Sequence, residues 1–126
     1  MDFLDKRIED YSQIFSDREP SLLKEIHDYT LQNVPQPRML SGHLQGRFLS
    51  MISKIKRPKK ILEIGTYTGY SALCMAEGLD EKGELITLDR DKSLYDKVSE
   101  FFNRSEYKNQ IIQRLGNALD LSLIHI

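Results

Sequence analysis

The residues best suited to chemistry lie together in one short segment, Glu63-Ile64-Gly65-Thr66-Tyr67-Thr68-Gly69-Tyr70-Ser71. This segment joins a predicted strand to a predicted helix, and at such a junction a ligand can lie against backbone N–H groups. Gly65 permits a tight turn and the close approach of a ligand, and Gly69 lets the helix pack near the strand. The segment therefore predicts a site for a small molecule, although a glycine-rich turn alone could also be a simple tight connection.

The spacing of the two glycines distinguishes between classes of ligand. A dinucleotide site uses G-x-G-x-x-G, in which the second glycine lets a pyrophosphate touch the backbone. In this chain Tyr67 stands at that position, and its side chain would obstruct the approach. The spacing E-x-G-x-x-x-G instead suits a nucleoside without phosphates, and S-adenosylmethionine is the commonest such ligand.

Two further features follow the next two predicted strands. Asp89 ends the second strand, 24 positions after Gly65, and an acidic residue there can accept two hydrogen bonds from a ribose diol. Gly116, Asn117 and Ala118 follow the third strand, and such small residues leave room for a flat adenine. Asp89 taken alone could equally be a solvated loop carboxylate. Since ligands of open parallel sheets bind at the carboxyl ends of the strands, we expect the three features to form one crevice.

From Pro58 onward, predicted strands and helices alternate along the chain and carry these residues. The apolar runs KKILEIG, ELITLD and IIQRL predict three strands, and the stretches between them predict a helix over residues 70–79 and another around 94–102. Strand and helix in alternation indicate an α/β fold with a parallel sheet and crossover helices.

The sequence before Pro58 predicts three helices. One spans residues 3–15 with a stripe of Leu4, Ile8, Tyr11 and Phe15. A second begins near Pro20, and a loop with two prolines follows it. A third starts near Ser41, a plausible N-cap. We expect the buried face of this third helix to consist of Leu44, Phe48, Met51, Ile52 and Ile55.

Length and composition limit the class of protein. The chain has 126 residues, which suits one domain, and it is 40% hydrophobic and 29% charged. A net charge of −1 argues against electrostatic capture of nucleic acid or of an anionic membrane. The apolar stretches are too short to span a membrane, and the N-terminus has no signal pattern. We therefore expect a cytoplasmic protein that binds a small molecule and has no nucleic-acid or membrane partner. Its one cysteine, Cys74, is expected to be a residue of the core.

The stretch from QPRMLSG through EIGTYTGYSAL to ITLDRD resembles the bacterial O-methyltransferases related to catechol and caffeoyl-CoA O-methyltransferases, over roughly residues 30–120. The resemblance implies a Rossmann-like class I methyltransferase fold with a seven-stranded sheet. It also implies transfer of a methyl group from S-adenosylmethionine to an oxygen, commonly a phenolic hydroxyl of a small acceptor. A divalent metal and a homodimer are left open for the complete protein.

The resemblance also implies roles for individual residues. Tyr67 and Ser71 match positions that line the methionine and ribose part of the cofactor, and Asp89 matches the acid that holds the ribose hydroxyls. Ser41 and Gly42 match a loop over the methionine carboxylate. Ala118 matches a position beside the adenine, and Glu63 would organise the site through backbone or water contacts. The expected cofactor-binding residues are Ser41, Gly42, Glu63, Gly65, Tyr67, Gly69, Ser71, Asp89, Gly116 and Ala118.

In the family, metal ligands and any general base come later in the chain, after a fourth strand. This sequence stops before one, so we expect no catalytic or metal-ligating residue in it and treat it as truncated after the third strand. We divide it into a helical segment (1–40), the cofactor-binding half of the domain (41–120) and a non-native tail (121–126). The ending LSLIHI resembles the translation of a sequencing-library adapter.

Without a fourth strand, residues 60–64 would form an exposed sheet edge. We expect this chain alone to be marginally stable and inactive. Two other readings stay open at this point. One is a nucleotide-binding Rossmann oxidoreductase, and the other is a helical interaction module built on the N-terminal helices. His27 and His43 are expected to be surface residues of the helical region.

Overall fold

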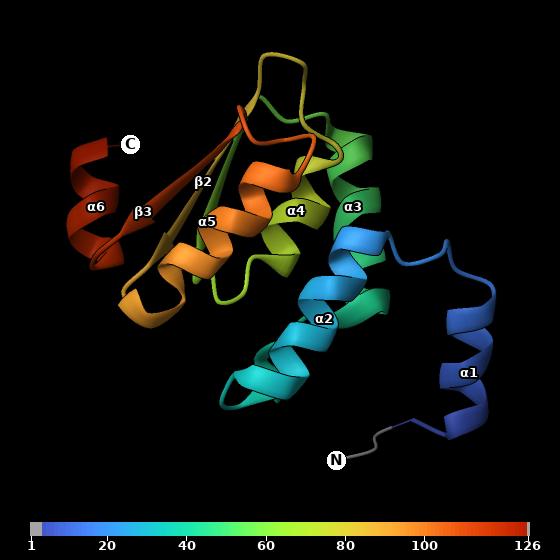
Figure 1. Ribbon diagram of the computed structural model, residues 1–126. Helices are drawn as coiled ribbons and strands as arrows, with labels where there is room; N and C mark the ends of the chain where they lie inside the picture. Colours follow the sequence, from blue (N-terminus) through green and yellow to red (C-terminus); the bar gives the residue numbers. More distant parts are fainter. Residues whose placement is uncertain (1–3, 126) are drawn as a thin grey trace.

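The computed structural model describes the backbone of residues 4–125 and the side chains of residues 4–121 (Figure 1). Within that range the strands β1, β2 and β3 form a parallel sheet in the order β1-β2-β3, which confirms the predicted α/β class. The elements in chain order are α1 (Lys6–Ile14), α2 (Ser21–Asn33), η1 (Pro37–Met39), α3 (Gly42–Lys56), β1 (Lys60–Ile64), α4 (Tyr70–Ala76), β2 (Glu84–Asp89), η2 (Lys92–Leu94), α5 (Tyr95–Arg104), β3 (Ile111–Leu115) and α6 (Ala118–His125).

The register of the sheet brings the carboxyl ends of the strands together. Ile64 pairs with Leu88, and Asp89 pairs with Leu115. β1 and β3 are followed at this edge by the turns that carry Gly65 and Gly116, and β2 ends there with Asp89. The alternation of strand and crossover helix therefore places the three sequence features at one end of the sheet, as expected for this architecture.

The core lies between the sheet and helices α2, α4 and α5 (Figure 1). Leu85 of β2 is fully buried there, as is Phe101 of α5. Helix α2 contributes Leu23 and Ile26 to the same cluster, so this part of the N-terminal segment shares the core of the sheet domain. Burial of these apolar side chains is the main favourable contribution to folding.

The opposite face of the sheet is more exposed. β1 lies at the edge of the described sheet, and its Leu62 and Ile64 are 43% and 68% exposed. Helix α6 contacts β2 from this side. Side chains of residues 122–126 lie outside the described part of the chain, so the non-native tail proposed for residues 121–126 stays a prediction.

The predicted buried face of α3 is wrong. Phe48, Met51, Ile52 and Ile55 are all at least 43% exposed, while Gly46, Ser50 and Ser53 are the buried residues of this helix. Small side chains let α3 approach α4 closely, and the Ser53 hydroxyl donates to the carbonyl of Met75. Apolar periodicity identifies a face of a helix, but close packing between helices can select the face of small residues instead.

Three smaller expectations also need correction. Ser41 has helical backbone angles and makes no side-chain capping hydrogen bond, so it does not cap α3 in the expected way. Helix α4 ends at Ala76 rather than at residue 79. Helix α1 is shorter than predicted and buries none of its described residues, and Tyr11 and Phe15 of its apolar stripe are 63% and 73% exposed.

An ion pair joins α3 to the end of α4. The Arg47 guanidinium donates to both carboxylate oxygens of Glu77, at 2.9 and 2.7 Å, and both side chains are largely buried. Removing one partner of such a pair leaves an uncompensated buried charge. Arg47 also lies 3.7 Å from the thiol of Cys74, which is fully buried, as the sequence predicted.

We expect Cys74 to resist alkylation in the folded protein. Burial raises the pKa of its thiol to about 12, although the neighbouring Arg47 opposes this shift. Because the thiolate is the reactive form, iodoacetamide at pH 8 should modify Cys74 only after denaturation. Mass spectrometry of native and urea-treated samples checks this, and rapid labelling of the native protein would contradict the burial of this residue.

None of the helices in the described part of the chain has the length and apolar character that a bilayer crossing needs.

Candidate cofactor-binding site

The glycine turn between β1 and α4 has an unusual backbone. Gly65 and Gly69 have φ of 98° and 85°, and Tyr67 between them has φ of 50°. A Cβ at Gly65 would meet no atom within 4 Å, so this position is open toward a ligand. The turn thus leaves space directly after β1, where the sequence predicted close approach of a ligand.

Backbone N–H groups of this turn are already used within the protein. The N–H of Gly65 donates to the Leu88 carbonyl at 2.8 Å, and that of Gly69 donates to the Thr66 carbonyl at 2.9 Å. The N–H of Tyr67 donates to Oδ2 of Asp89 at 2.9 Å. A phosphate-binding loop needs free N–H groups directed at the anion. These three are not available, which disfavours a pyrophosphate as the ligand.

Asp89 is fixed at the end of β2. Its Oδ2 accepts the Tyr67 N–H, and its Oδ1 accepts the N–H of Asp91 at 2.8 Å. The expected proximity of Asp89 to the carboxyl end of β1 is therefore confirmed, and Asp89 is not a freely solvated loop carboxylate. Each oxygen of a carboxylate can accept more than one hydrogen bond, so this group can also receive hydroxyl donors from a ligand.

Glu63 lies behind the turn in a network of hydroxyl groups. Ser71 Oγ and Thr87 Oγ1 each donate to its carboxylate at 2.6 Å, and Thr66 Oγ1 is hydrogen-bonded to Thr87 Oγ1 at 2.6 Å. Burial raises the pKa of Glu63, while the two hydroxyl donors act in the opposite direction. Its partners are the side chains of Ser71 and Thr87, whereas backbone or water contacts were expected. Thr66 and Thr87 were not among the predicted site residues, although each is a hydroxyl residue inside or beside an apolar strand.

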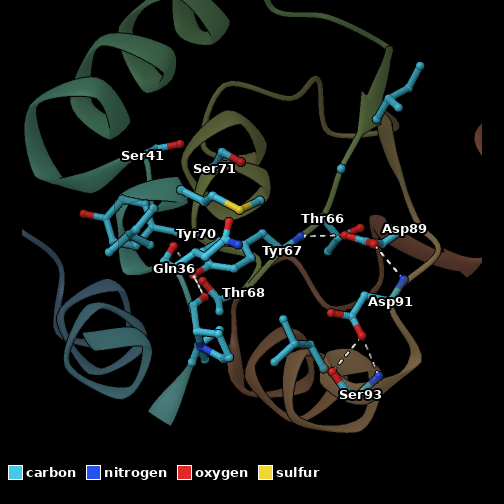
Figure 2. Close-up of a pocket in the computed structure, with 17 residues that line it drawn as sticks. Gln36, Ser41, Thr66, Tyr67, Thr68, Tyr70, Ser71, Asp89, Asp91 and Ser93 are labelled. Atoms are coloured by element: carbon cyan, nitrogen blue, oxygen red, sulfur yellow. Dashed lines mark hydrogen bonds between the residues drawn. The ribbon is translucent and has the colours of Figure 1, made fainter. Parts of the chain in front are cut away.

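A cavity of about 570 Å³ opens over the turn (Figure 2), a size typical of small-molecule sites. Five of the predicted site residues line it, and they come from the α3 entrance, the glycine turn, α4 and β2. These residues are Ser41, Gly65, Tyr67, Ser71 and Asp89. Ser41 thus lies on the same cavity as Gly65 and Tyr67, which is the position expected of an element covering the turn.

A second cavity, of about 300 Å³, continues along the ends of the strands. Gly116 and Ala118 line it, together with Gly65 and Asp89, which it shares with the first cavity. The three sequence features therefore border two adjacent cavities, which share Gly65 and Asp89 and lie at the carboxyl ends of the strands.

Three predicted site residues lie outside both cavities. Gly42 lines a separate hollow with His27 and His43. Glu63 is beneath the turn, as described above. Gly69 lies at the end of the turn, where an added Cβ would be 2.8 Å from the Phe102 ring of α5, and its expected role in packing α4 near β1 stays a prediction.

The loop before α3 supplies a wall of the larger cavity that was not predicted. The residues of this loop that line the cavity are Val34, Pro35, Gln36, Met39 and Leu40. Gln36 lies across the cavity from Asp91 and Ser93, which follow β2 (Figure 2). The sequence signal for this loop was its prolines, which exclude a helix but do not show what the loop covers. Among the side chains of residues 4–121, no group of three His, Cys, Asp or Glu gathers in a way that could hold a metal ion.

Fold and site together define an α/β protein of Rossmann-like type with two cavities at the carboxyl ends of its strands. Residues 12–123 match the O-methyltransferase family, and the chain belongs to that family. It is 35% identical over 102 residues to caffeoyl-CoA O-methyltransferase 2 of Zea mays, and the matched region covers 81% of this chain and 38% of that protein. It is 36% identical over 92 residues to catechol O-methyltransferase of Niastella koreensis, which covers 73% of this chain and 42% of that protein.

Solved structures show the same architecture. The O-methyltransferase from Bacillus cereus in complex with SAH superimposes with a TM-score of 0.83 at 29% identity, over 94% of this chain and 54% of that one. The SAH-bound methyltransferase PaMTH1 of Podospora anserina gives a TM-score of 0.81 at 30% identity, over 90% and 49%. The chain spans about two-fifths of the length of the curated relatives above.

Proposed function

We propose that this chain binds S-adenosylmethionine and forms the cofactor-binding part of an O-methyltransferase that acts on a hydroxyl of a small phenolic or catechol-like acceptor. The observation that carries the proposal is the pair of adjacent cavities that share Asp89, with Tyr67 on the first and Ala118 on the second. Membership of the O-methyltransferase family supports it, and so do the SAH-bound structures with the same fold.

The residues on these cavities fit the parts of this cofactor. Asp89 would accept the ribose hydroxyls, because its carboxylate is held in place by two backbone N–H donors. Ser41, Gly65, Tyr67 and Ser71 would surround the methionine part. The adenine would lie in the smaller cavity beside Gly116 and Ala118, where the lining side chains are small.

When bound, S-adenosylmethionine supplies a methyl group on a sulfonium, which an acceptor oxygen can displace in line. The contribution of this chain is to hold the cofactor in one geometry, since positioning lowers the barrier to such a transfer. Glu63 contributes indirectly, because its hydrogen bond fixes the Ser71 hydroxyl at the cavity wall. Ionisation of the acceptor, with or without a divalent metal, would fall to residues beyond the cofactor half, and a homodimer of the complete protein is compatible with this arrangement.

Binding assays distinguish this proposal from the hypothesis of a nucleotide-binding oxidoreductase. We expect S-adenosylhomocysteine at one hundred times its Kd to stabilise the full protein that the gene encodes by about 2.7 kcal/mol. NAD should give no shift, because Tyr67 and its engaged N–H leave no site for a pyrophosphate. Thermal unfolding with each ligand checks this, and a shift with NAD alone would favour the oxidoreductase.

A second candidate function rests on α1. Its exposed Ile8 and Tyr11, with the exposed Phe15 directly after the helix, favour a surface for another protein. A pure interaction module would show no thermal shift with either ligand.

A further inference from the structure

Backbone strain in this protein gathers at the cavity. Among the described residues, the non-glycine residues with positive φ are Gln36, Arg57 and Tyr67, at 59°, 45° and 50°. Gln36 and Tyr67 both line the larger cavity, although they are 31 positions apart in the chain. Side chains disfavour this left-handed region, and residues held in it often mark sites where the structure constrains a ligand.

The two strained residues are joined directly. The Tyr67 hydroxyl donates to the carbonyl of Gln36 at 3.1 Å, and it also lies 3.3 Å from the carbonyl of Pro35 (Figure 2). The same Gln36 carbonyl accepts the N–H of Met39 at 3.0 Å, which closes the short helix η1. Within residues 4–121, no other side-chain hydrogen bond links residues 34–40 to the glycine turn.

Tyr67 is itself anchored from the other side. Its N–H donates to Asp89, and the adjacent Thr68 accepts a hydrogen bond from the buried Thr30 of α2 at 3.0 Å. The turn is therefore fixed to both β2 and α2. Residues 35–39, in contrast, are exposed, and only two backbone hydrogen bonds close the short helix η1 at their end. A fixed tyrosine can hold an exposed loop in place, because the tyrosine is already ordered by the turn. Forming the hydrogen bond to the loop then costs little further conformational entropy.

We propose that the Tyr67 hydroxyl is a positioning group that holds the loop of residues 34–40 as the outer wall of the cavity. The inference rests on the proposed function for the identity of the ligand, but the contact between Tyr67 and Gln36 exists without one. The phenyl ring alone would still line the cavity. The hydroxyl adds a hydrogen bond between the glycine turn and the loop of residues 34–40. Without this bond the loop should open more often, and a bound nucleoside should dissociate faster.

The test compares Tyr67→Phe with Tyr11→Phe, which removes a hydroxyl from an exposed residue of α1 that does not line the cavity. Both variants are made in the full protein that the gene encodes. Without any ligand, hydrogen exchange at the amides of Met39 and Leu40 should become about fivefold faster in Tyr67→Phe, the factor expected for one net hydrogen bond. Exchange in the core, at Leu85 and Phe101, should not change, and Tyr11→Phe should match the wild type at all of these positions.

The second readout uses S-adenosylhomocysteine as the probe. Its dissociation rate, from stopped-flow displacement, should rise about threefold or more in Tyr67→Phe, because opening of the wall becomes more frequent. Unchanged exchange at Met39 and Leu40 would overturn the proposal, and so would equal acceleration across the core, which would indicate a general loss of stability. If the wild type binds no S-adenosylhomocysteine, the proposed function fails, while the exchange measurement still decides the role of the hydroxyl.

Discussion

Replacing Asp89 with alanine is expected to weaken S-adenosylmethionine binding by about 1.5–3 kcal/mol, roughly 10-fold to 150-fold in Kd. The reason is the loss of a charged acceptor of ribose hydroxyls that lines both cavities. Asp89 also receives the N–H of Tyr67 and of Asp91. Its removal therefore leaves two backbone donors without their acceptor and loosens both sides of the site.

Calorimetry on the full protein that the gene encodes measures this effect. Asp10→Ala is the matched control, because Asp10 pairs with Lys6 on the exposed face of α1, away from the cavity. Asp89→Asn should fall between alanine and the wild type, since the amide keeps one oxygen acceptor but presents an NH₂ group to a backbone N–H. An unchanged Kd in Asp89→Ala would remove this residue from the site.

The parts of the fold that sequence predicts well here are those governed by local pattern. The runs KILEI and ELITLD are short, apolar and bounded by turn residues, and each forms the predicted strand. Asp89 could be placed next to Gly65 because parallel strands bring their carboxyl ends to one edge. This is a consequence of topology, which needs no knowledge of side-chain packing.

Features governed by packing between distant segments were not predicted. The apolar stripe of α3 suggested that Phe48 and Met51 were buried, but contact with α4 uses Gly46 and Ser53. The hydrogen bond from Tyr67 to Gln36 ends on a backbone carbonyl, so the residue type at position 36 does not predict it. Glu63 was identified from its place in the motif, yet its partner Thr87 comes from a different strand. Each of these contacts depends on the relative position of two elements, which a single sequence does not contain.

The packing of α3 on α4 leads to the largest stability effect that we expect. Gly78 follows α4, and a Cβ at this position would lie 2.2 Å from the backbone carbon of Ser53 and 2.3 Å from the backbone nitrogen of Lys54. Backbone atoms cannot rotate away as a flexible side chain can, so α3 would have to move as a whole. Gly78→Ala should therefore destabilise the protein by about 3 kcal/mol or more, at the upper end of overpacking costs.

Urea denaturation compares this variant with Gly42→Ala. At Gly42 an added Cβ meets no atom within 4 Å, so the cost is that of its positive φ, about 1 kcal/mol. Since α3 begins beside Ser41, a displaced α3 should also move that residue at the cavity wall. Molecules of Gly78→Ala that stay folded should then bind S-adenosylhomocysteine more weakly than those of Gly42→Ala. A loss of stability no greater than that of Gly42→Ala would show that α3 and α4 are not packed as closely as described.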